Sequence, residues 1–450
     1  MTHSPEDAGS TMPASTTLQD SFLREMSWRG LIHQCTDLPT LDAHLAGAPR
    51  RAYAGFDPTA DSLTIGNLVT IMALAHLQRA GHTPIVLMGG ATGLIGDPSG
   101  KSAERTLQTK EQVEANVARI RKIFEGILDF DGPSAAVMVD NIQWWGGISY
   151  LDALRDVGKH FSVNMMIQKD SVRSRLENRD QGISYTEFSY MILQAYDFAH
   201  LARSQGVTLQ MGGSDQWGNI VAGTDLIRRM AGGDGPAAGA PAFGLTWPLV
   251  TKADGTKFGK TESGAIWLTP ERTSPFAYMQ FWLNAADADV GRFLRTFTFV
   301  PRAEVERLEH ETRTNPGARE AQRVLAREAT AIVHGRDAME RAEAAGKALF
   351  SGEVAGLPEA TFLEVLSAAP SSDRARAELD GAGANLLDLL VATGLAGSKR
   401  EAKEFVQAGS VSINGKKASA DTNVTAADLL HGRYTALRRG KKLWHLIRWG

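Results

Sequence analysis

The chain has 450 residues, of which 43% are hydrophobic and 22% are charged, and it contains one cysteine. These fractions are typical of a globular protein in water, and the length allows two or three domains, each with its own core. No apolar run approaches the roughly 20 residues that cross a bilayer. The single cysteine, Cys35, excludes an internal disulfide and suits a reducing cytoplasm.

The net charge of −3 is unevenly distributed along the chain. Residues 398–450 contain 11 Lys or Arg and 4 Asp or Glu, a balance of +7, so the preceding 397 residues carry −10. A basic end on an acidic body indicates a nucleic-acid contact at that end. A solvated charged surface explains the charge equally well.

Residues 1–20 begin with MTHSPEDAGSTMPAST, which lacks the basic start and apolar stretch of a secretory signal, and we expect a disordered tail. From residue 51, candidate strands alternate with helical segments, the first of which runs from about residue 66 to 80. The candidate strands are RAYAGF, TPIVLMGG, AVMVDN, VTLQMGG and FGLTWPLV. This alternation predicts a Rossmann-like parallel α/β domain over residues 21–250, in which ligands bind beyond the carboxyl ends of the strands.

The strand pattern fades after residue 272. We expect a mobile loop over residues 251–272 and a helical domain over residues 273–370, because EAQRVLAREATAIVHG and DAMERAEAAGKALF have helical spacing. Residues 371–384 are polar and rich in Gly and Ala, which predicts a linker. Residues 385–450 are expected to form a small α+β module.

Five polar joints are candidates for chemistry. The first reads AGFDPTADSLTIGNL: the chain turns at Asp57 and a helix starts near Gly66. The free N–H groups of a helix start favour phosphate, and Thr59, Thr64 and Asn67 add neutral donors. The same residues also suit an ordinary N-capped joint.

The second joint reads GGATGLIGDPSGKS. It is not a phosphate-binding P-loop, because Ile95 stands six places before Lys101 where that motif needs glycine. Asp97 could hold an ammonium group, and Lys101 and Arg105 a phosphate chain. A glycine-rich turn with surface charges is the alternative.

The third candidate is a helical stripe in which Tyr190, Gln194 and Asp197 share one face through i, i+4, i+7 spacing. Buried polar groups need partners, so the three either satisfy one another and the neighbouring backbone or face a polar ligand. The fourth is the GGSDQWGN segment, where glycines allow close approach of a ligand and Asp215 could accept from ribose hydroxyls. A tight turn is the alternative there.

The fifth joint, TKADGTKFGKT, places Lys257 and Lys260 on either side of a glycine, with the hydroxyl of Thr261 beside the second lysine. Such a loop could close over a triphosphate and stabilise departing pyrophosphate. Surface turns rich in Lys and Gly have the same composition.

Taken together, these segments resemble the tyrosyl-tRNA synthetases, which have the class I synthetase fold. The resemblance rests on YAGFDPTADSL, GGATGLIGDPSGK, TEFSYMILQAYDF, GGSDQWGN and TKADGTKFGKTESG, in this order, and covers about residues 50–450. KFGKT stands where the class I mobile loop, usually KMSKS, is expected, and TIGN stands where the family has HIGH. The resemblance implies ATP-dependent activation of L-tyrosine to tyrosyl-adenylate and transfer of tyrosine to the 3′ end of its tRNA, releasing AMP and pyrophosphate.

The resemblance also implies a role for each joint. Tyrosine would be held by Tyr53, Asp97, Tyr190, Gln194, Asp197, Gln210 and Gln216. ATP would be bound by Gly55, Asp57, Gly66, Gly213, Asp215 and Lys260. The catalytic groups would be Thr59, Thr64, Asn67, Lys101, Arg105, Lys257, Lys260 and Thr261. Tyr53 and Asp197 would hydrogen-bond the phenol hydroxyl, and rejection of phenylalanine by such a pair is a known property of this family.

The segment NLLDLLVATGLAGSKREAKEFVQAGSVSINGKK is similar to a small RNA-binding domain first known from a ribosomal small-subunit protein. The resemblance implies tRNA contacts from the following cations of this module: Lys399, Arg400, Lys403, Lys416 and Lys417, with Arg438, Arg439, Lys441 and Lys442 extending the patch. In the catalytic domain, Arg228 and Arg229 are expected to meet the acceptor arm of the tRNA. It further implies a cytoplasmic homodimer that works in protein biosynthesis without a membrane. Magnesium is expected to arrive with ATP, because the sequence shows no metal-binding cluster of His, Cys and carboxylates.

Two positions depart from the family's pattern. Thr64 replaces the first histidine of HIGH, which keeps a donor but loses the imidazole, and Ala54 stands where many relatives have a cysteine. Two other functions remain open: a synthetase for tryptophan, which the polar pair Tyr53 and Asp197 disfavours, and an RNA-binding protein that has lost activation.

Overall fold

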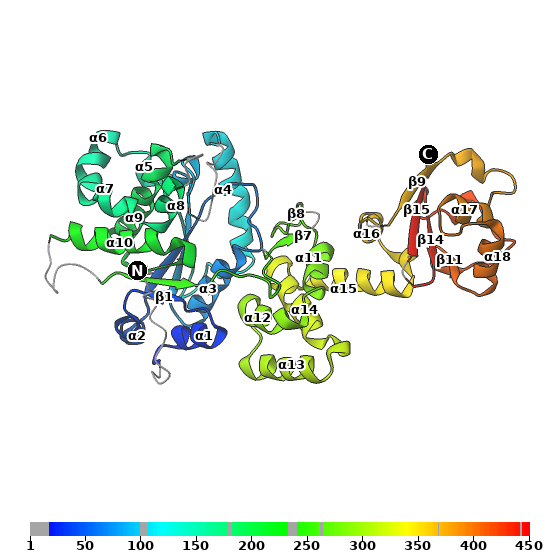
Figure 1. Ribbon diagram of the computed structural model, residues 1–450, viewed down its shortest axis with the longest axis horizontal. Helices are drawn as coiled ribbons and strands as arrows, with labels where there is room; N and C mark the ends of the chain where they lie inside the picture. The colour runs from blue at the N-terminus through cyan, green and yellow to red at the C-terminus, as the bar shows by residue number, and fades with distance from the viewer. Residues whose placement is uncertain are drawn as a thin grey trace, which may run out of the picture. The chain divides into compact units, whose positions relative to one another are not determined.

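The computed structural model describes residues 18–99, 107–177, 182–232, 241–256, 258–261, 264–367, 369–441 and 443–450 (Figure 1). They divide into two compact units. The first contains the described residues up to Thr273 together with Trp282–His334, and the second contains Ser274–Phe281 and Gly335–Gly450. A helix long and apolar enough to cross a membrane is not found in the described residues.

The first unit is built on a six-stranded sheet in the order β1-β6-β5-β2-β3-β4. Its strands are β1 (Gln34–Cys35), β2 (Arg51–Phe56), β3 (Thr83–Met88), β4 (Val137–Asp140), β5 (Val207–Gly213) and β6 (Phe243–Trp247). All pairs are parallel except β1 with β6, so the predicted parallel α/β fold is confirmed. Strands β3, β5 and β6 are buried along almost their whole length, which requires cover on both faces of the sheet.

Helices supply this cover, among them α3 (Leu68–Arg79), α9 (Tyr185–Gln205) and α10 (Trp217–Met230), which pack against β3, β5 and β6. The other helices of the unit are α1 (Ser21–Arg29), α2 (Leu38–Gly47), α4 (Lys110–Glu125), α5 (Ile142–Trp145), α6 (Tyr150–Asp152), α7 (Val163–Ile167), α8 (Asp170–Glu177), α12 (Asp287–Phe297), α13 (Arg302–Thr314) and α14 (Glu320–His334). The expected tail ends earlier than residue 20, because Asp20 accepts from Leu23 N at 2.9 Å and so caps α1. Residues 1–17 lie outside the described residues.

The strand order reverses beside β2. The chain runs from β2 outwards through β3 and β4 and then returns to place β5 on the other side of β2, where Tyr53 and Gln210 are register partners. A reversal of this kind opens a crevice at the carboxyl ends of the two strands. The fold therefore predicts a ligand site between β2 and β5.

Two segments far apart in sequence pair beside this crevice. Ile65 N donates to Ile266 O at 2.9 Å, Leu268 N donates to Leu63 O at 2.9 Å, and Ile266 N donates to Gly259 O at 3.0 Å. The ring of Phe258 stacks on that of Phe297, with centroids 5.1 Å apart. The described part of the KFGKT region is thus attached to the TIGN segment by backbone hydrogen bonds.

The second unit ends in a five-stranded sheet in the order β12-β11-β14-β15-β9. Its helices are α15 (Arg336–Ser351), α16 (Glu359–Val365), α17 (Leu386–Ala392) and α18 (Lys399–Gln407), and α11 (Pro275–Leu283) lies across the boundary between the units. Its strands are β9 (Ser371–Arg374), β10 (Ala384–Asn385), β11 (Val411–Ile413), β12 (Lys416–Lys417), β13 (Asn423–Val424), β14 (Tyr434–Arg439) and β15 (Leu443–Trp449). The expected helical domain over 273–370 is therefore divided, with α12–α14 in the first unit and α15–α16 in the second.

The linker predicted over residues 371–384 is wrong. Strand β9 pairs in parallel with β15, placing Ser371 opposite Leu446, and Ser372 Oγ lies 3.0 Å from His445 Nε2. Its composition misled because β9 is an edge strand with alternating exposed residues, which needs few apolar side chains. Polar composition alone does not distinguish such a strand from a linker.

Arg438, predicted as an RNA contact, is buried instead. Its guanidinium donates to Phe350 O at 2.8 Å, to Ser351 O at 3.0 Å and to Lys441 O at 2.9 Å, and it lies over the Trp444 ring. Two of these carbonyls are among the last of α15, which has no further turn to satisfy them. Arg438 therefore fastens the terminal sheet to α15 and is not available to phosphate.

We predict that Arg438→Ala lowers the stability of the second unit by about 2–3 kcal/mol, because it leaves buried carbonyls without a charged donor. Urea unfolding followed by circular dichroism measures the loss. Arg400→Ala is the matched control: that side chain is 91% exposed, pairs with Glu404 at 3.5 Å, and should cost less than about 0.5 kcal/mol. Equal costs for the two substitutions would contradict the capping role.

Candidate active site

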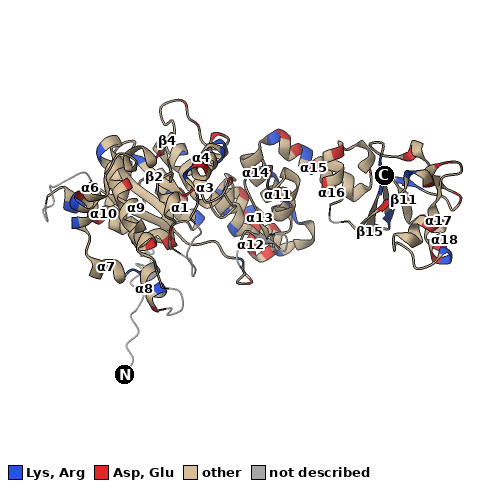
Figure 2. Ribbon diagram, turned by 90° about the horizontal axis from the view of Figure 1, so that it is seen from above, with Lys and Arg blue, Asp and Glu red and all other residues tan. Residues whose placement is uncertain are grey.

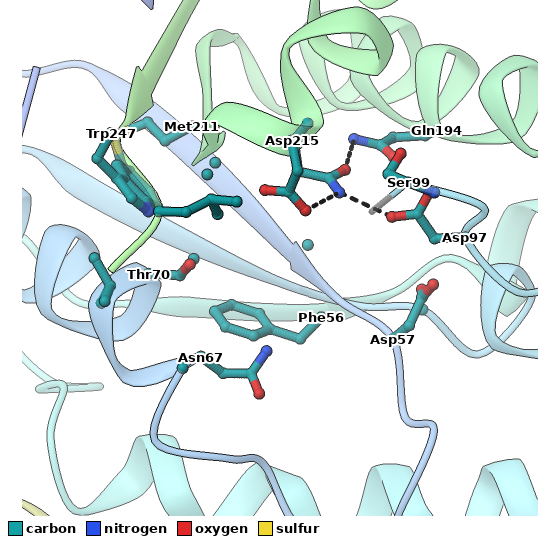
Figure 3. A pocket seen from close by; sticks show the side chains of 18 of the residues that line it. Phe56, Asp57, Asn67, Thr70, Asp97, Ser99, Gln194, Met211, Asp215 and Trp247 are labelled. Atoms are coloured by element: carbon teal, nitrogen blue, oxygen red, sulfur yellow. Dashed lines mark hydrogen bonds between the residues drawn. The ribbon is translucent and has the colours of Figure 1, made fainter. Parts of the chain in front are cut away.

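A cavity of about 620 Å³ lies at the carboxyl ends of the strands of the first unit. Fifteen of the residues singled out in the sequence line it: Tyr53, Gly55, Asp57, Thr59, Thr64, Gly66, Asn67, Asp97, Tyr190, Gln194, Asp197, Gln210, Gly213, Asp215 and Gln216. Figure 3 shows several of these side chains pointing toward one another from different elements. Joints that are far apart in the sequence thus meet in one cleft.

One end of the cavity holds two buried groups. Tyr53 is 0% exposed and its hydroxyl makes no hydrogen bond in the structure. Asp197 is 1% exposed and accepts from Asn141 Nδ2 at 3.0 Å, Trp144 Nε1 at 2.8 Å and Trp145 Nε1 at 2.9 Å. Burial raises the pKa of Asp197 to about 7 against the effect of these donors. Burial, and then the charge of Asp197, raises the pKa of Tyr53, so the phenol stays protonated.

Asp57 organises the side of the cavity nearest β2. Its Oδ2 accepts from the Tyr190 hydroxyl at 2.8 Å, and its Oδ1 accepts from the Thr92 hydroxyl at 2.7 Å. A Cβ at Gly89 would collide with Oδ1 of Asp57, so only glycine allows this approach. Because Tyr190 donates its proton to Asp57, its oxygen lone pairs remain available as acceptors.

An amide network crosses the opposite side, where Figure 3 draws its hydrogen bonds. Gln216 Nε2 donates to Asp97 Oδ2 at 2.8 Å and to Asp215 Oδ2 at 3.3 Å. Gln194 Nε2 donates to Gln216 Oε1 at 3.3 Å, and Asn219 Nδ2 donates to Gln194 Oε1 at 3.0 Å. Burial raises the pKa of Asp215. The amides of Gln194 and Gln216 are therefore held in place by hydrogen bonds to each other and to neighbouring side chains, among them the carboxylates of Asp97 and Asp215.

The polar groups of Thr64 contact the side chain of Asn67. Its backbone N and its hydroxyl lie 3.0 Å and 2.9 Å from Asn67 Oδ1. A backbone N–H can only donate, so this contact fixes the orientation of the amide and leaves its Nδ2 donor for the cleft. The Thr64 hydroxyl, which the resemblance assigns to phosphate, is therefore an orienting group for Asn67 in this structure.

Several cations expected at the phosphates fall outside the described residues: Lys101, Arg105 and Lys257. The backbone of Lys260 and Thr261 forms strand β7 (Lys260–Thr261), paired with β8 (Gly264–Ala265), and their side chains are likewise not described. The assignments of these five residues stay predictions.

The cavity also contains residues that the sequence did not single out. A wall formed by Trp247–Thr251 follows β6, and Thr70, Met211 and Phe258 add further lining. Asn141, Trp144 and Trp145 follow β4 and reach Asp197. The rule that ligands bind beyond the carboxyl ends of strands could have indicated the segments after β4 and β6. Spacing alone does not connect them to the cleft.

The cations expected to contact RNA differ in whether they already have a partner in the protein. In the first unit Arg229 donates to His160 O at 2.8 Å, and Arg228 lies 3.6 Å from Asp225. In the second unit Lys399 pairs with Asp388. The remaining predicted side chains are exposed on α18 and β12: Arg400, Lys403, Lys416 and Lys417.

Further along the proposed RNA patch, Arg439 donates to Leu395 O at 2.6 Å and its guanidinium lies 4.6 Å from the centroid of the Phe405 ring. Lys441 is exposed, and Lys442 lies outside the described residues. Figure 2 marks basic residues on α18 beside acidic ones. The described residues form no cluster of three or more His, Cys, Asp or Glu side chains able to hold a metal.

Comparison with known proteins gives two family matches. A model for class I tRNA synthetases (W and Y) matches residues 46–351, and a model for the tyrosine–tRNA ligase SYY-like C-terminal domain matches residues 367–447. The chain is 52% identical over 432 residues to a tyrosine–tRNA ligase of Dechloromonas aromatica, covering 96% of this chain and 99% of that protein. It is 51% identical over 430 residues to a tyrosine–tRNA ligase of Geobacillus stearothermophilus, covering 95% and 99%.

Among solved structures, a C-terminally truncated mitochondrial tyrosyl-tRNA synthetase of Aspergillus nidulans is similar with a TM-score of 0.67 and 31% identity. The match covers 73% of this chain and 94% of that chain.

We predict that Asp197 titrates near pH 7, with the carboxylate form lost as the pH falls through this value. Asn141→Ala should raise this pKa by about 1–2 units, because one hydrogen bond to the charged form is removed. Carbon-13 NMR of protein labelled at aspartate carboxyls measures both. Asp156, whose pKa the neighbouring Arg155 lowers, is the internal control. Titration of Asp197 near its ordinary value of 3.8 would contradict the assignment.

Proposed function

The chain belongs to the tyrosine–tRNA ligase family of class I tRNA synthetases, enzymes that activate tyrosine with ATP and charge its tRNA, and on that premise we propose how its own residues do so. The observation that carries the proposal is the unpartnered hydroxyl of Tyr53, buried in the same cavity as the carboxylate of Asp197. A buried donor without a partner is costly, and a ligand that supplies one removes the cost.

The phenol end of tyrosine complements both groups. Its oxygen accepts from Tyr53, which otherwise has no partner, and its hydroxyl donates to Asp197 as a further donor beside the three that the protein supplies. Phenylalanine leaves the Tyr53 hydroxyl unpaired and offers no donor to the open position of Asp197, and an indole ring has no acceptor for Tyr53. This pair therefore favours tyrosine over both other aromatic amino acids.

The α-ammonium group is a donor only and needs acceptors. Asp97, the oxygen of Tyr190 and the carbonyl of Gln194 supply them. Gln216, with Gln210 behind it, then orients the tyrosine carboxylate; both amides line the cavity. These contacts place the carboxylate at the end of the cavity where ATP binds.

For ATP, we assign the ribose hydroxyls to Asp215 and place Asp57 and Thr59 beside the nucleotide. The glycines Gly55, Gly66 and Gly213 let the nucleotide approach the backbone. Asn67, oriented by Thr64, turns its amide donor to the phosphates at the start of α3.

The chemical step needs no covalent nucleophile from the protein. The tyrosine carboxylate oxygen attacks the α-phosphorus of ATP as the bond to pyrophosphate breaks, giving tyrosyl-adenylate; positioning and stabilisation of the leaving charge supply the acceleration. Lys260, Thr261 and Lys257 engage the departing pyrophosphate, with Lys101 and Arg105. Magnesium enters with the phosphates of ATP, for which oxygen ligands of the nucleotide are well suited.

In the second step a hydroxyl of the terminal ribose of tRNA attacks the adenylate carbonyl and AMP leaves. We assign the acceptor arm to Arg228 and Arg229 of the first unit. The second unit binds a part of the tRNA away from the acceptor end, through cations of α18 and β12 that contact phosphate: Lys399, Arg400, Lys403, Lys416 and Lys417. The cytoplasm, where tRNA is charged for protein synthesis, is the proposed location.

We predict that Asp197→Ala lowers kcat/KM for tyrosine in ATP–pyrophosphate exchange by about 10- to 100-fold, because a hydrogen bond to a charged group is lost. KM for ATP should change little. Asp131→Ala, an exposed aspartate outside the cavity lining, serves as the control. Near-normal exchange in the Asp197 variant would refute the phenol assignment.

We also propose that the enzyme is a homodimer through an apolar face of the first unit. Of the twelve large hydrophobic side chains that are exposed in the described part of the chain, eight lie between residues 150 and 185. They are Tyr150, Leu151, Leu154, Val163, Met165, Ile167, Leu176 and Tyr185. The hydroxyls of Tyr150 and Tyr185 lie 3.1 Å apart, so α6 and the start of α9 share this face. Apolar surface gathered in this way indicates an interface.

We predict that Leu151→Asp converts the dimer into a monomer at micromolar concentration, because it places a charge in the apolar face where Leu151 is 75% exposed. Analytical ultracentrifugation measures the change. Phe350→Asp is the matched control, since Phe350 is 74% exposed but lies in the second unit. If the native protein sediments as a monomer, the proposed interface is wrong.

A further inference from the structure

The carboxylate of Asp197 is unusually saturated with donors. Trp144 Nε1 and Trp145 Nε1 both donate to Oδ1, at 2.8 Å and 2.9 Å, while Asn141 Nδ2 donates to Oδ2 at 3.0 Å. A carboxylate offers about four acceptor directions, two on each oxygen. Oδ1 is therefore full, and Oδ2 has one direction left.

Two consecutive side chains of a helix do not ordinarily face the same way. Here α5 is a single turn that starts at the carboxyl end of β4, and each indole packs on a ring from α9. The ring of Trp144 stacks on that of His200 with centroids 4.4 Å apart, and the ring of Trp145 packs on that of Tyr196 with centroids 4.9 Å apart. Helix α9 thus supplies both the carboxylate and the two platforms that hold its donors.

We propose that Trp145 is a positioning residue for the carboxylate that binds the substrate phenol: by sharing Oδ1 with Trp144 it leaves Asp197 one open acceptor direction, on Oδ2, and so fixes where the phenol hydroxyl binds. The proposal rests on the assignment of Asp197 as the phenol acceptor. All three protein donors are neutral N–H groups. They stabilise the carboxylate form, and in that form the phenol hydroxyl makes a charge-assisted hydrogen bond.

The surrounding titratable groups are consistent with this role. On the cavity side the charge of Asp57 acts on Asp197, and the hydroxyls of Tyr53 and Tyr190 are both protonated because burial raises their pKa. On the far side His200 stacks on Trp144, and burial lowers the pKa of its imidazole. The guanidinium of Arg203 lies 5.8 Å from the centroid of the Tyr196 ring. The carboxylate form of Asp197 therefore depends on its neutral donors.

Removal of the Trp145 donor has a defined consequence for the pH dependence. The pKa of Asp197 rises when a hydrogen bond to its charged form is lost, so more of the enzyme is protonated at neutral pH. A protonated carboxyl loses acceptor capacity for the phenol. Tyrosine binding should weaken at neutral pH and recover as the pH rises and the carboxylate forms again.

The test is ATP–pyrophosphate exchange by the full-length enzyme with Trp145→Phe, from about pH 6 to about pH 9. The phenyl ring keeps the contact with Tyr196 and lacks the N–H. We expect KM for tyrosine to rise about tenfold at pH 7 and to approach the native value at the alkaline end. KM for ATP and kcat at saturating tyrosine should stay within about twofold. Trp144→Phe should shift the profile in the same direction.

Two controls separate hydrogen bonding from packing. Trp28→Phe makes the same substitution on α1, where the tryptophan is partly buried and does not line the cavity. Tyr196→Phe keeps the ring on which Trp145 packs and removes a hydroxyl that does not hydrogen-bond to Asp197. Both should retain the native pH profile.

The outcomes distinguish this inference from the proposed function. A Trp145→Phe profile that superimposes on the native one overturns the inference, as does an equal rise in KM for tyrosine and ATP, which indicates general disruption. If Asp197→Ala inactivates while Trp145→Phe has no effect, the inference alone fails. If Asp197→Ala is fully active, the phenol assignment itself fails.

Discussion

The pairing of β2 with β5 is the constraint on which the site depends. It places Tyr53 beside Gln210 in register and opens the crevice into which the ends of β3, β4 and β6 also lead. Each strand contributes a different kind of group. Strand β2 brings the phenol of Tyr53 and the carboxylate of Asp57, and β3 ends at the turn of Gly89. Strand β5 brings the amide of Gln210, and β6 leads into the apolar wall that starts at Trp247. None of the joints has a specific geometry by itself. The parallel register of the sheet brings them together in one cavity, to which we assign a phenol end and a phosphate end.

The cavity is also distinguished by its charge. Four carboxylates line it, from Asp57, Asp97, Asp197 and Asp215, and burial raises the pKa of Asp197 and Asp215. Neutral donors stabilise the carboxylates: amides, hydroxyls and indoles. The ammonium group of tyrosine is a cation that would complement this cavity. A cavity of this kind favours charged ligands of the right geometry over water and over apolar amino acids.

Much of the fold and of the candidate site could be predicted from the sequence. The remaining features could not be predicted, for physical reasons. The five predicted strands follow from apolar runs, several of which end at glycines, and the helical stripe of Tyr190, Gln194 and Asp197 follows from helical periodicity. Strand β9 was hidden because an edge strand needs little apolar content. The indole donors to Asp197 could not be read from the sequence, because Trp144 and Trp145 lie about fifty residues away from it and hydrogen bonds across a fold leave no periodic pattern. Arg438 resembles any other basic residue until its carbonyl partners are known.

The three donors to Asp197 have a consequence for attempts to alter which amino acid the pocket accepts. Replacing Asp197 by an apolar residue, the obvious way to admit a ring without a hydroxyl, leaves the N–H groups of Asn141, Trp144 and Trp145 without an acceptor. Each orphaned donor costs about 1–3 kcal/mol, so the pocket would be destabilised before any new contact formed. The acceptor and its donors therefore have to be exchanged as one set, with the rings of Tyr196 and His200 repacked around the replacement.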